Sequence, residues 1–250
     1  LGHDEVLRLE EHAEVARAAI ALGVTKVRIT GGEPLVKRGL LSLVRELAAA
    51  PGLETLALTT NGTRLSELAR ALAEAGIRRV NVSLDSLSPE AFARITRGGD
   101  AARVVAGIDA ALAAGLPVKI NTVLLAGVNT GEIAALAAFA RERGIGVRFI
   151  ELMPFERDLA PFTEADALAA LAAAGEEVAP LPADPAEPHV RRYAFRGGAI
   201  GFISPVSRPF CGGCNKIRLT PAGALKPCLA SDAAIDVRTV LRRPHSAAAV

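Results

Sequence analysis

Residues 26–34 read Lys-Val-Arg-Ile-Thr-Gly-Gly-Glu-Pro, a short β-rich run followed directly by two glycines. Within the run, the apolar residues Val27 and Ile29 alternate with charged or polar ones. Alternation with a period of two predicts a β-strand with one apolar face and one polar face. An Ala/Leu-rich stretch with helical spacing lies on each side of this run, so the strand is read as one member of a strand-and-helix series.

The same pairing of a strand with a helix recurs along the first 152 residues. The expected strands are 26–30, 55–60, 79–85, 118–125 and 146–152. The expected helices are 4–22, 39–50, 64–75, 100–114 and 131–143, and a glycine ends each of them: Gly23, Gly52, Gly76, Gly115 and Gly144. Glycine is favoured just past a helix because it adopts the left-handed conformation without penalty. Alternating strands and helices predict an α/β fold with a parallel sheet, either open or closed into a barrel.

The polar faces of the strands distinguish a barrel from an open sheet. Val80 and Val82 alternate with Asn81 and Ser83, and the run 118–122 places Lys119 and Asn121 between apolar residues. Parallel strands that are buried on both faces are nearly all apolar. The polar face is therefore expected to line a lumen that holds a polar ligand, in a partial barrel of the TIM type. The alternative is an open sheet with one solvated face, which parallel sheets rarely show.

The strand-and-helix rhythm stops after residue 152. Residues 154–188 are rich in proline and contain one helical patch near 163–173, and two short β-like runs follow at 190–195 and 199–204. We therefore expect a barrel core over residues 1–153 and a C-terminal extension over residues 154–250. All three cysteines of the chain lie in this extension.

Composition excludes several classes of protein. With 250 residues, 50% hydrophobic content and a net charge of +2, the chain is not disordered, and charged residues interrupt every apolar stretch that could span a membrane. Three clustered cysteines do not form a secreted disulfide framework, so a reducing, cytoplasmic setting is expected. The charge gives no sign of nucleic-acid binding. The sequence opens Leu1-Gly2-His3 without a methionine. This start favours a truncated chain that lacks its first strand, and proteolytic processing is the alternative.

Short motifs follow three of the expected strands. The loop Gly31-Gly32-Glu33-Pro34 offers close backbone approach and a carboxylate, although by itself it could be a simple tight turn. The runs 59–62 (Thr-Thr-Asn-Gly) and 83–86 (Ser-Leu-Asp-Ser) stand at the next two strand ends. Barrel enzymes place their sites at the carboxyl ends of the strands, so these loops are candidate ligand contacts.

The C-terminal cysteines form the strongest local motif. Cys211, Cys214 and Cys228 are spaced C-x2-C-x13-C. A structural zinc site needs a fourth ligand, for which His189 and His245 are the candidates, whereas three thiolates fit an iron–sulfur cluster with one open iron. A pair of buried structural cysteines is the remaining alternative. The neighbouring cations Lys216, Arg218 and Lys226 are either surface charge on a strand or a clamp for an anionic ligand.

Taken together, these motifs resemble those of radical S-adenosylmethionine (SAM) enzymes. The segments 119–121 (Lys-Ile-Asn), 148–153 (Arg-Phe-Ile-Glu-Leu-Met) and 210–220, around the first two cysteines, narrow the resemblance to the GTP 3′,8-cyclases of molybdenum cofactor biosynthesis. The resemblance covers residues 5 to about 230. The Gly-Gly-Glu-Pro loop is shared by many radical enzymes, and the cysteine segment is the more specific part.

The resemblance implies a set of site residues. The implied GTP contacts are Arg28, Thr59, Lys119, Lys216, Ile217 and Arg218. The implied SAM contacts are Gly32, Glu33, Ser83 and Met153, with Glu33 near the amino group of SAM. A C-terminal [4Fe–4S] cluster is implied on Cys211, Cys214 and Cys228, with its open iron contacting guanine. No catalytic residue is assigned.

The resemblance also implies a reaction. A deoxyadenosyl radical derived from SAM abstracts hydrogen from the GTP ribose, whose carbon then bonds to guanine C8. The product is (8S)-3′,8-cyclo-7,8-dihydroguanosine 5′-triphosphate, the first intermediate towards precursor Z, cyclic pyranopterin monophosphate. An electron donor and the next enzyme of the pathway are the implied partners, and a homodimer is an open expectation.

The sequence departs from the family in two places. The family's C-x3-C-x2-C motif for a second [4Fe–4S] cluster precedes the first expected helix and is not in this sequence, and the chain ends Ala-Ala-Ala-Val rather than in two glycines. The 250 residues alone are therefore expected to be inactive. The alternatives are another radical SAM enzyme with an auxiliary C-terminal cluster, or a non-catalytic zinc-binding scaffold.

Overall fold

A computed structural model describes residues 5–153, 161–185 and 187–243. Within these ranges, the strands are β1 (Lys26–Ile29), β2 (Thr55–Thr60), β3 (Arg79–Ser83), β4 (Val118–Leu124), β5 (Gly146–Glu151), β6 (Val178–Leu181), β7 (Arg191–Phe195), β8 (Gly198–Ile203), β9 (Arg218–Leu219), β10 (Ala224–Lys226) and β11 (Ile235–Asp236). The α-helices are α1 (Leu9–Ala21), α2 (Leu40–Ala48), α3 (Leu65–Ala75), α4 (Pro89–Thr96), α5 (Ala101–Ala113), α6 (Ile133–Glu142), α7 (Glu164–Ala173) and α8 (Val237–Leu241). Short 3-10 turns are η2 (Pro34–Val36), η3 (Thr130–Glu132) and η4 (Cys211–Gly213). None of the helices in the described ranges has the length and apolar character needed to cross a membrane.

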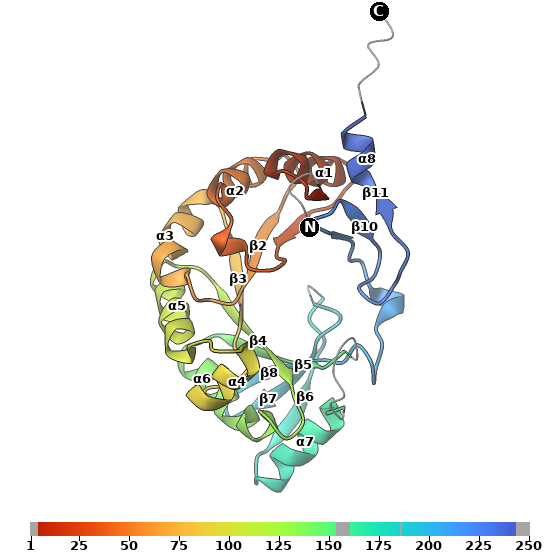
Figure 1. The fold of residues 1–250 in the computed structure, drawn as a ribbon. Helices are drawn as coiled ribbons and strands as arrows, with labels where there is room; N and C mark the ends of the chain where they lie inside the picture. Colours follow the sequence, from red (N-terminus) through yellow and green to blue (C-terminus); the bar gives the residue numbers. More distant parts are fainter. Residues whose placement is uncertain (1–4, 154–160, 186, 244–250) are drawn as a thin grey trace, which may run out of the picture.

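The main sheet has eight strands in the order β1-β2-β3-β4-β5-β8-β7-β6. Pairing is parallel from β1 through β5 to β8 and antiparallel from β8 through β7 to β6. The sheet curves with helices along its outer side (Figure 1) but does not close, because β1 and β6 remain its two edges. The prediction of an α/β partial barrel is therefore confirmed.

The outer face of the sheet forms the core together with the helices. Leu58, Val82, Ile120 and Phe149 are fully buried on successive strands, and the apolar faces of α2, α3, α5 and α6 cover them (Figure 1). Each such side chain contributes roughly 1.5–3 kcal/mol of burial energy. Truncation of Leu58 to alanine would leave a cavity at the centre of this layer and cost about 2–5 kcal/mol.

The inner face of the sheet carries the polar residues. The register aligns Thr59 of β2 with Asn81 of β3 and Lys119 of β4, and it aligns Asn121 of β4 with Arg148 of β5. Along β4 buried and half-buried residues alternate strictly, as the sequence pattern predicts. The polar side chains from several strands therefore share one concave face.

The observed elements extend the prediction past residue 152. Strand β8 pairs with β5, so the main sheet continues across the expected boundary at residues 153 and 154, and the division into core and extension stays a prediction. Helix α1 begins at Leu9, later than the expected helix start at residue 4, which lies outside the described ranges. The sequence analysis did not predict α8, β6 or the small strands β9–β11, all of which are short.

A second sheet of three strands, β11-β10-β9, follows the cysteine segment and lies beside the start of α1 (Figure 1). The backbone N–H of Leu7 donates to the carbonyl of Pro221 at 2.7 Å, and Arg242 forms an ion pair with the buried carboxylate of Glu11 at 2.7 Å. These contacts bring the C-terminal part of the chain next to its N-terminal helix. The three-stranded sheet next to the cysteine segment is thereby connected to the start of α1.

Candidate functional site

Three cations of the inner face converge on one carboxylate. Arg79 Nη1 lies 3.1 Å and Lys119 Nζ lies 2.8 Å from Oε1 of Glu187, and Arg148 Nη2 donates to the same oxygen. The cations come from β3, β4 and β5, whereas Glu187 comes from the loop between β6 and β7. This loop points towards the middle of the curved sheet (Figure 1). The basic cluster is the name used below for the three cations Arg79, Lys119 and Arg148, and Glu187 is its carboxylate.

Burial and mutual repulsion set the protonation of this cluster. Desolvation lowers the pKa of Lys119 and of Arg148, although the hydrogen bond to Glu187 acts in the opposite direction. Burial favours the protonated form of Glu187, but Lys119 and Arg148 outweigh it and lower its pKa to about 2. At neutral pH the site therefore holds three cations against one carboxylate, and its excess charge is positive.

Two further cations face the same space. Arg28 of β1 is exposed, yet desolvation by the surrounding protein and repulsion from Arg148 and Arg79 lower its pKa. Lys216, beyond the second cysteine, is half-buried, and its pKa is lowered by desolvation and by repulsion from Arg28, Arg218 and Arg148, against an opposing effect of Cys214. The structure thus brings together predicted GTP contacts that come from β1, β4 and the C-terminal segment.

Unpaired polar atoms mark the same face. In the described part of the chain, three buried side-chain atoms have no hydrogen-bond partner: Arg79 Nε, Asn81 Oδ1 and Asn121 Oδ1. All three lie on the inner faces of β3 and β4. Asn81 uses its amide N–H to donate to Thr59 Oγ1 at 3.3 Å and leaves its oxygen free. Because an unsatisfied buried polar atom costs about 1–3 kcal/mol, this face is suited to a ligand that offers N–H or O–H donors as well as an anion.

An aromatic contact connects the basic cluster to the cysteine segment. The ring centroid of His189 lies 5.6 Å from that of Phe210, and Lys216 Nζ lies 5.3 Å from the Phe210 centroid on a cation–π contact. Desolvation, with repulsion from Lys216 and Arg148, lowers the pKa of His189 to about 4. His189 is therefore a neutral imidazole inside a cationic site at pH 7.

Glu33 of the Gly-Gly-Glu-Pro loop connects the ends of β1 and β2 through hydrogen bonds. Its Oε1 accepts hydrogen bonds from the backbone N–H of Leu35 at 3.0 Å and from the Thr60 hydroxyl at 2.7 Å. Its Oε2 accepts from the backbone N–H of Asn61 at 2.7 Å. The carboxylate thus fixes the loop after β1 against the end of β2, and its predicted contact with the amino group of SAM stays a prediction.

The other predicted contacts of SAM lie at or just after the carboxyl ends of β1, β3 and β5. Gly32 is exposed, and a Cβ added to it would meet no atom within 4 Å. Ser83, the last residue of β3, and Met153, just after β5, are both half-buried. The structure does not test the individual contacts of these residues with SAM.

The three cysteines are all free and exposed. Cys211 and Cys214 stand at the two ends of the η4 turn, and Cys228 follows β10. Within the described residues, no group of three or more His, Cys, Asp or Glu side chains is arranged to hold a metal ion. Of the two candidate zinc ligands, His189 is not part of any such group in the described ranges, and His245 lies outside them.

The comparisons with known proteins agree with the motifs. The sequence profile of the Radical SAM superfamily matches residues 1–140, and the profile described as Molybdenum Cofactor Synthesis C matches residues 145–250. A GTP 3′,8-cyclase from Moorella thermoacetica is 45% identical over 247 residues, which are 96% of this chain and 76% of that protein. Another, from Pelotomaculum thermopropionicum, is 46% identical over 97% of this chain and 77% of its own length. The chain belongs to the GTP 3′,8-cyclase family of radical SAM enzymes.

Solved structures support the fold of this GTP 3′,8-cyclase family member. Streptococcus suis SuiB bound to S-adenosylmethionine superposes with a TM-score of 0.67 at 14% identity, over 92% of this chain and 56% of that one. A second crystal structure of Streptococcus suis SuiB gives a TM-score of 0.64 over 89% of this chain and 54% of that one. At this identity the similarity concerns the fold alone, and it agrees with the matched superfamily.

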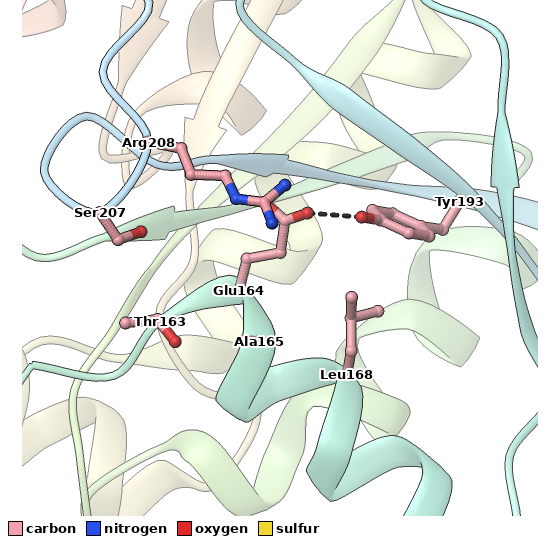
Figure 2. Close-up of a pocket in the computed structure, with 7 residues that line it drawn as sticks. All are labelled: Thr163, Glu164, Ala165, Leu168, Tyr193, Ser207 and Arg208. Carbon is pink, nitrogen blue, oxygen red and sulfur yellow. Dashed lines mark hydrogen bonds between the residues drawn. The ribbon is translucent and has the colours of Figure 1, made fainter.

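A pocket of about 160 Å³ lies elsewhere in this family member (Figure 2). It is lined by Thr163, Glu164, Ala165, Leu168, Tyr193, Ser207 and Arg208. Burial opposes ionisation of Glu164, but hydrogen bonds from Arg191 at 2.8 Å and from the Tyr193 hydroxyl at 2.5 Å outweigh it and lower its pKa. The Glu164 carboxylate thereby connects the start of α7 to two residues of β7.

Some site residues of this cyclase family member were not among the predicted contacts. Arg148 lies between Val147 and Phe149 and therefore carries the same alternation signal as Lys119, so the sequence pattern could have identified it. Arg79 opens its strand, and Glu187 lies in a loop without any periodic pattern. The contact between Arg79 and Glu187 joins residues that are 108 positions apart in the sequence, and no local sequence pattern indicates it. Of the predicted GTP contacts, Ile217 is 55% exposed and Arg218 is half-buried in β9.

Proposed function

We propose that this chain binds GTP on the inner face of its sheet and thereby supplies the substrate site of a GTP 3′,8-cyclase of molybdenum cofactor biosynthesis. The product is (8S)-3′,8-cyclo-7,8-dihydroguanosine 5′-triphosphate, which leads to precursor Z. Membership of the family supports the reaction, and the two matched profiles support its radical SAM class and its pathway. The observation that carries the substrate is the convergence of Arg79, Lys119 and Arg148 on one anionic group.

The chemistry of a nucleoside triphosphate suits this face. Arginine binds phosphate oxygens in a bidentate manner and lysine adds a compact positive charge, so a cluster of both is typical of phosphate recognition. Arg28 and Lys216 extend the positive surface on either side of the basic cluster. The unpaired oxygens of Asn81 and Asn121 supply acceptors for hydroxyl or amino groups, which guanosine carries and inorganic phosphates lack.

In this proposal the GTP contacts divide by position. Arg28 and Lys119 face the phosphates from the sheet, and Thr59 lies beside Asn81 on the same face. Lys216 and Arg218 approach from the C-terminal segment with Ile217 between them. Their side chains position the triphosphate and leave the purine towards the cysteine segment.

The proposed SAM contacts are Gly32, Glu33, Ser83 and Met153, which surround the carboxyl ends of β1, β3 and β5. Besides the [4Fe–4S] cluster that reduces SAM, the family resemblance implies a C-terminal [4Fe–4S] cluster whose open iron contacts guanine. In this chain the donors that fit such a group are the three free thiols of Cys211, Cys214 and Cys228, which we propose as ligands of a C-terminal cluster. They are not gathered into a ligand set within the described residues, so the proposal rests on donor chemistry alone.

A [4Fe–4S] cluster distinct from the proposed C-terminal one would reduce bound SAM, and the resulting deoxyadenosyl radical would remove a hydrogen atom from the GTP ribose. The chain's own residues hold the triphosphate, orient the ribose and shield the interior of the sheet. An electron donor and the enzyme that consumes the cyclised nucleotide are the partners that this reaction requires. A second cluster, a homodimer and a cytoplasmic location remain parts of the proposal.

The test is a comparison of ligands and variants by isothermal titration calorimetry. The chain should bind GTP and inorganic triphosphate, and guanosine more weakly, because the basic cluster recognises phosphate. The pair Lys216→Ala and Arg218→Ala should weaken GTP binding while iron and sulfide assembly on the cysteines is unchanged. Unchanged GTP affinity in this pair would exclude the C-terminal clamp, and absence of GTP binding by the wild-type chain would exclude the proposed substrate.

A further inference from the structure

The carboxylate of Glu187 is the one anionic group that the three cations of the basic cluster share. Arg79, Lys119 and Arg148 all direct their contacts to its Oε1, and the Glu187 side chain is only 8% exposed. The three contacts connect Glu187 to residues 108, 68 and 39 positions away in the sequence. A single loop residue therefore occupies the point at which three strands present their positive charge.

The charges do not balance around this point. One carboxylate faces three cations in direct contact, and Arg28 and Asp184 act on the same cluster from slightly further away. A pairing with a purely structural role needs one cation for one carboxylate, and each additional buried cation adds a cost of desolvation. The surplus of positive charge indicates a site built for an anion with more negative charge than Glu187 carries.

The carboxylate matches part of such an anion. An ionised carboxyl group and a phosphoryl group both present oxygen acceptors to the same arginine and lysine donors, at similar distances. A polyphosphate offers several such oxygens and more charge, so it can satisfy the three cations separately. When a polyphosphate binds to these donors, the Glu187 carboxylate has to move out of its place among the three cations, because the two anions repel each other.

The surroundings of Glu187 allow this exchange. The loop is anchored by Val190, which is buried beside Gly201 of β8, while its residues Pro182, Ala183, Pro185 and Pro188 are exposed. Glu187 itself is held by its ion pairs and by two turn hydrogen bonds of its backbone, to Asp184 and from Val190, each of 2.9 Å. Rotation about its own side-chain bonds is enough to move the carboxylate away while the loop stays anchored.

We propose that Glu187 is an internal competitor for the substrate's polyphosphate: it fills one phosphate position in the ligand-free chain and is displaced when a triphosphate binds. The proposal rests on the proposed function, because it concerns the same site. Without substrate, Glu187 thereby holds the three cations in place. It also sets a minimum negative charge that a ligand must carry in order to displace it. Ligands with a single phosphate displace it poorly, and a triphosphate displaces it readily.

The experiment compares Glu187→Gln with the matched variant Glu164→Gln. Both replace a buried, hydrogen-bonded carboxylate by an amide of the same shape, but Glu164 contacts Arg191 and Tyr193, away from the basic cluster. Calorimetry at constant pH 7 and constant salt gives the Kd for inorganic triphosphate and for GTP. We expect Glu187→Gln to bind inorganic triphosphate at least tenfold more tightly than the wild-type chain, and Glu164→Gln to match the wild type. Equal or weaker binding by Glu187→Gln overturns the proposal.

A measurement on the wild-type chain covers the case in which Glu187→Gln does not fold. The carboxylate carbon of Glu187, followed by ¹³C NMR at pH 7, should shift when inorganic triphosphate saturates the site, because its three donors are withdrawn. An unchanged resonance at saturation overturns the proposal.

The two ligands separate this inference from the proposed function. If Glu187→Gln gains affinity for inorganic triphosphate but neither chain binds GTP more tightly than triphosphate, the displacement of Glu187 is supported and GTP as the substrate is not. If both chains bind GTP with the same Kd, GTP binding stands and the role of Glu187 is excluded. If neither ligand binds to either chain, both proposals fail.

Discussion

Lys119 Nζ of β4 lies 2.8 Å from Oε1 of Glu187, an ion pair between a strand in the middle of the sheet and a loop 68 residues later. The pair joins the inner face of the parallel part of the sheet to the antiparallel hairpin at its far edge. Since Arg79 and Arg148 share the same oxygen, the loop is connected to three strands through one side chain. The first prediction concerns what this connection contributes to folding.

Glu187→Gln should destabilise the ligand-free chain at pH 7 by about 3 kcal/mol, because it leaves buried cations without their counter-charge. A carboxylate whose folded pKa is depressed stabilises the fold above its ordinary pKa, here 4.5, and loses that contribution as pH falls towards its folded value of about 2. The gap between wild type and Glu187→Gln in urea unfolding should therefore narrow from pH 4.5 downwards. Glu14→Gln, on the exposed side of α1, serves as the control. A gap that stays constant down to pH 2.5 would contradict the assignment.

His189 gives a second pH-dependent effect in a different window. Its folded pKa of about 4 lies below its ordinary value of 6.5, so protons bind preferentially to the unfolded chain between these two values. The stability of the wild-type chain should accordingly fall as pH drops from 6.5 to 4. Allowing for solvent screening of a half-buried ring, the loss should be on the order of 1–2 kcal/mol.

His189→Gln should remove this component. The difference in unfolding free energy between pH 7 and pH 5 is measured for both chains, and the wild type should lose more. Proton NMR supplies an independent check, because the ring resonance that is missing in His189→Gln should titrate near pH 4 in the wild type. A resonance that titrates near 6.5 would show that the cations around His189 do not act on it.

Arg28 tests the phosphate face without breaking a buried ion pair. Arg28→Met should weaken the binding of GTP and of inorganic triphosphate about tenfold, which corresponds to roughly 1.4 kcal/mol for the loss of one charge-assisted contact. Arg70→Met is the matched control, because Arg70 lies on the exposed side of α3 with its side chain 90% exposed. Titration calorimetry of both variants at one salt concentration decides the matter. The same Kd for Arg28→Met and Arg70→Met would place the triphosphate away from β1.

Glu33 carries a prediction about folding that is separate from any cofactor. Its carboxylate accepts three hydrogen bonds that join the loop after β1 to the end of β2. Glu33→Ala should therefore cost about 2–3 kcal/mol. Thr60→Val removes one of the three bonds and also the acceptor for the backbone N–H of Gly62, so it should cost about 2 kcal/mol. Urea unfolding of the two variants measures both values. A residue that only contacted SAM would leave the stability of the ligand-free chain unchanged when replaced.

The inner face could be predicted from the sequence because burial against the helices imposes a period of two on the strands. Asn81 and Lys119 stand out between buried apolar neighbours, and both lie where that alternation places them. Strand β6 could not be predicted in the same way, although its partner β7 matches the β-like run expected at 190–195. Proline at position 180 argues against a strand, and β6 tolerates it only because it is an edge strand.

The carboxylate of Glu187 could not be predicted as part of the site for a different reason. Glu187 has no periodic neighbours, and the position of its loop depends on β8 joining the sheet beside β5. That pairing follows from the topology of the whole chain rather than from any local pattern. The cysteines show the reverse case. Their spacing is a clear signal in the sequence, yet within the described residues their side chains do not form a group that could hold a metal ion.

The last prediction concerns Gly201, which makes room for the loop that carries Glu187. A Cβ at Gly201 would lie 2.7 Å from Cγ1 of Val190, a stiff β-branched side chain that is only 3% exposed. At Gly146, on the same inner face, the nearest atom to an added Cβ would be Cγ of Lys119 at 3.9 Å, an ordinary contact. Replacing glycine by alanine gains about 0.4–1 kcal/mol from the unfolded chain at either position.

At Gly201 the overlap should outweigh this gain, because overpacking a filled interior costs about 1–3 kcal/mol. Gly201→Ala should therefore lower the free energy of unfolding, whereas Gly146→Ala should leave it unchanged or raise it slightly. Thermal and urea unfolding of the two variants give the comparison directly. If both substitutions stabilised the chain equally, Val190 would not lie against β8, and the anchor of the Glu187 loop would have to be sought elsewhere.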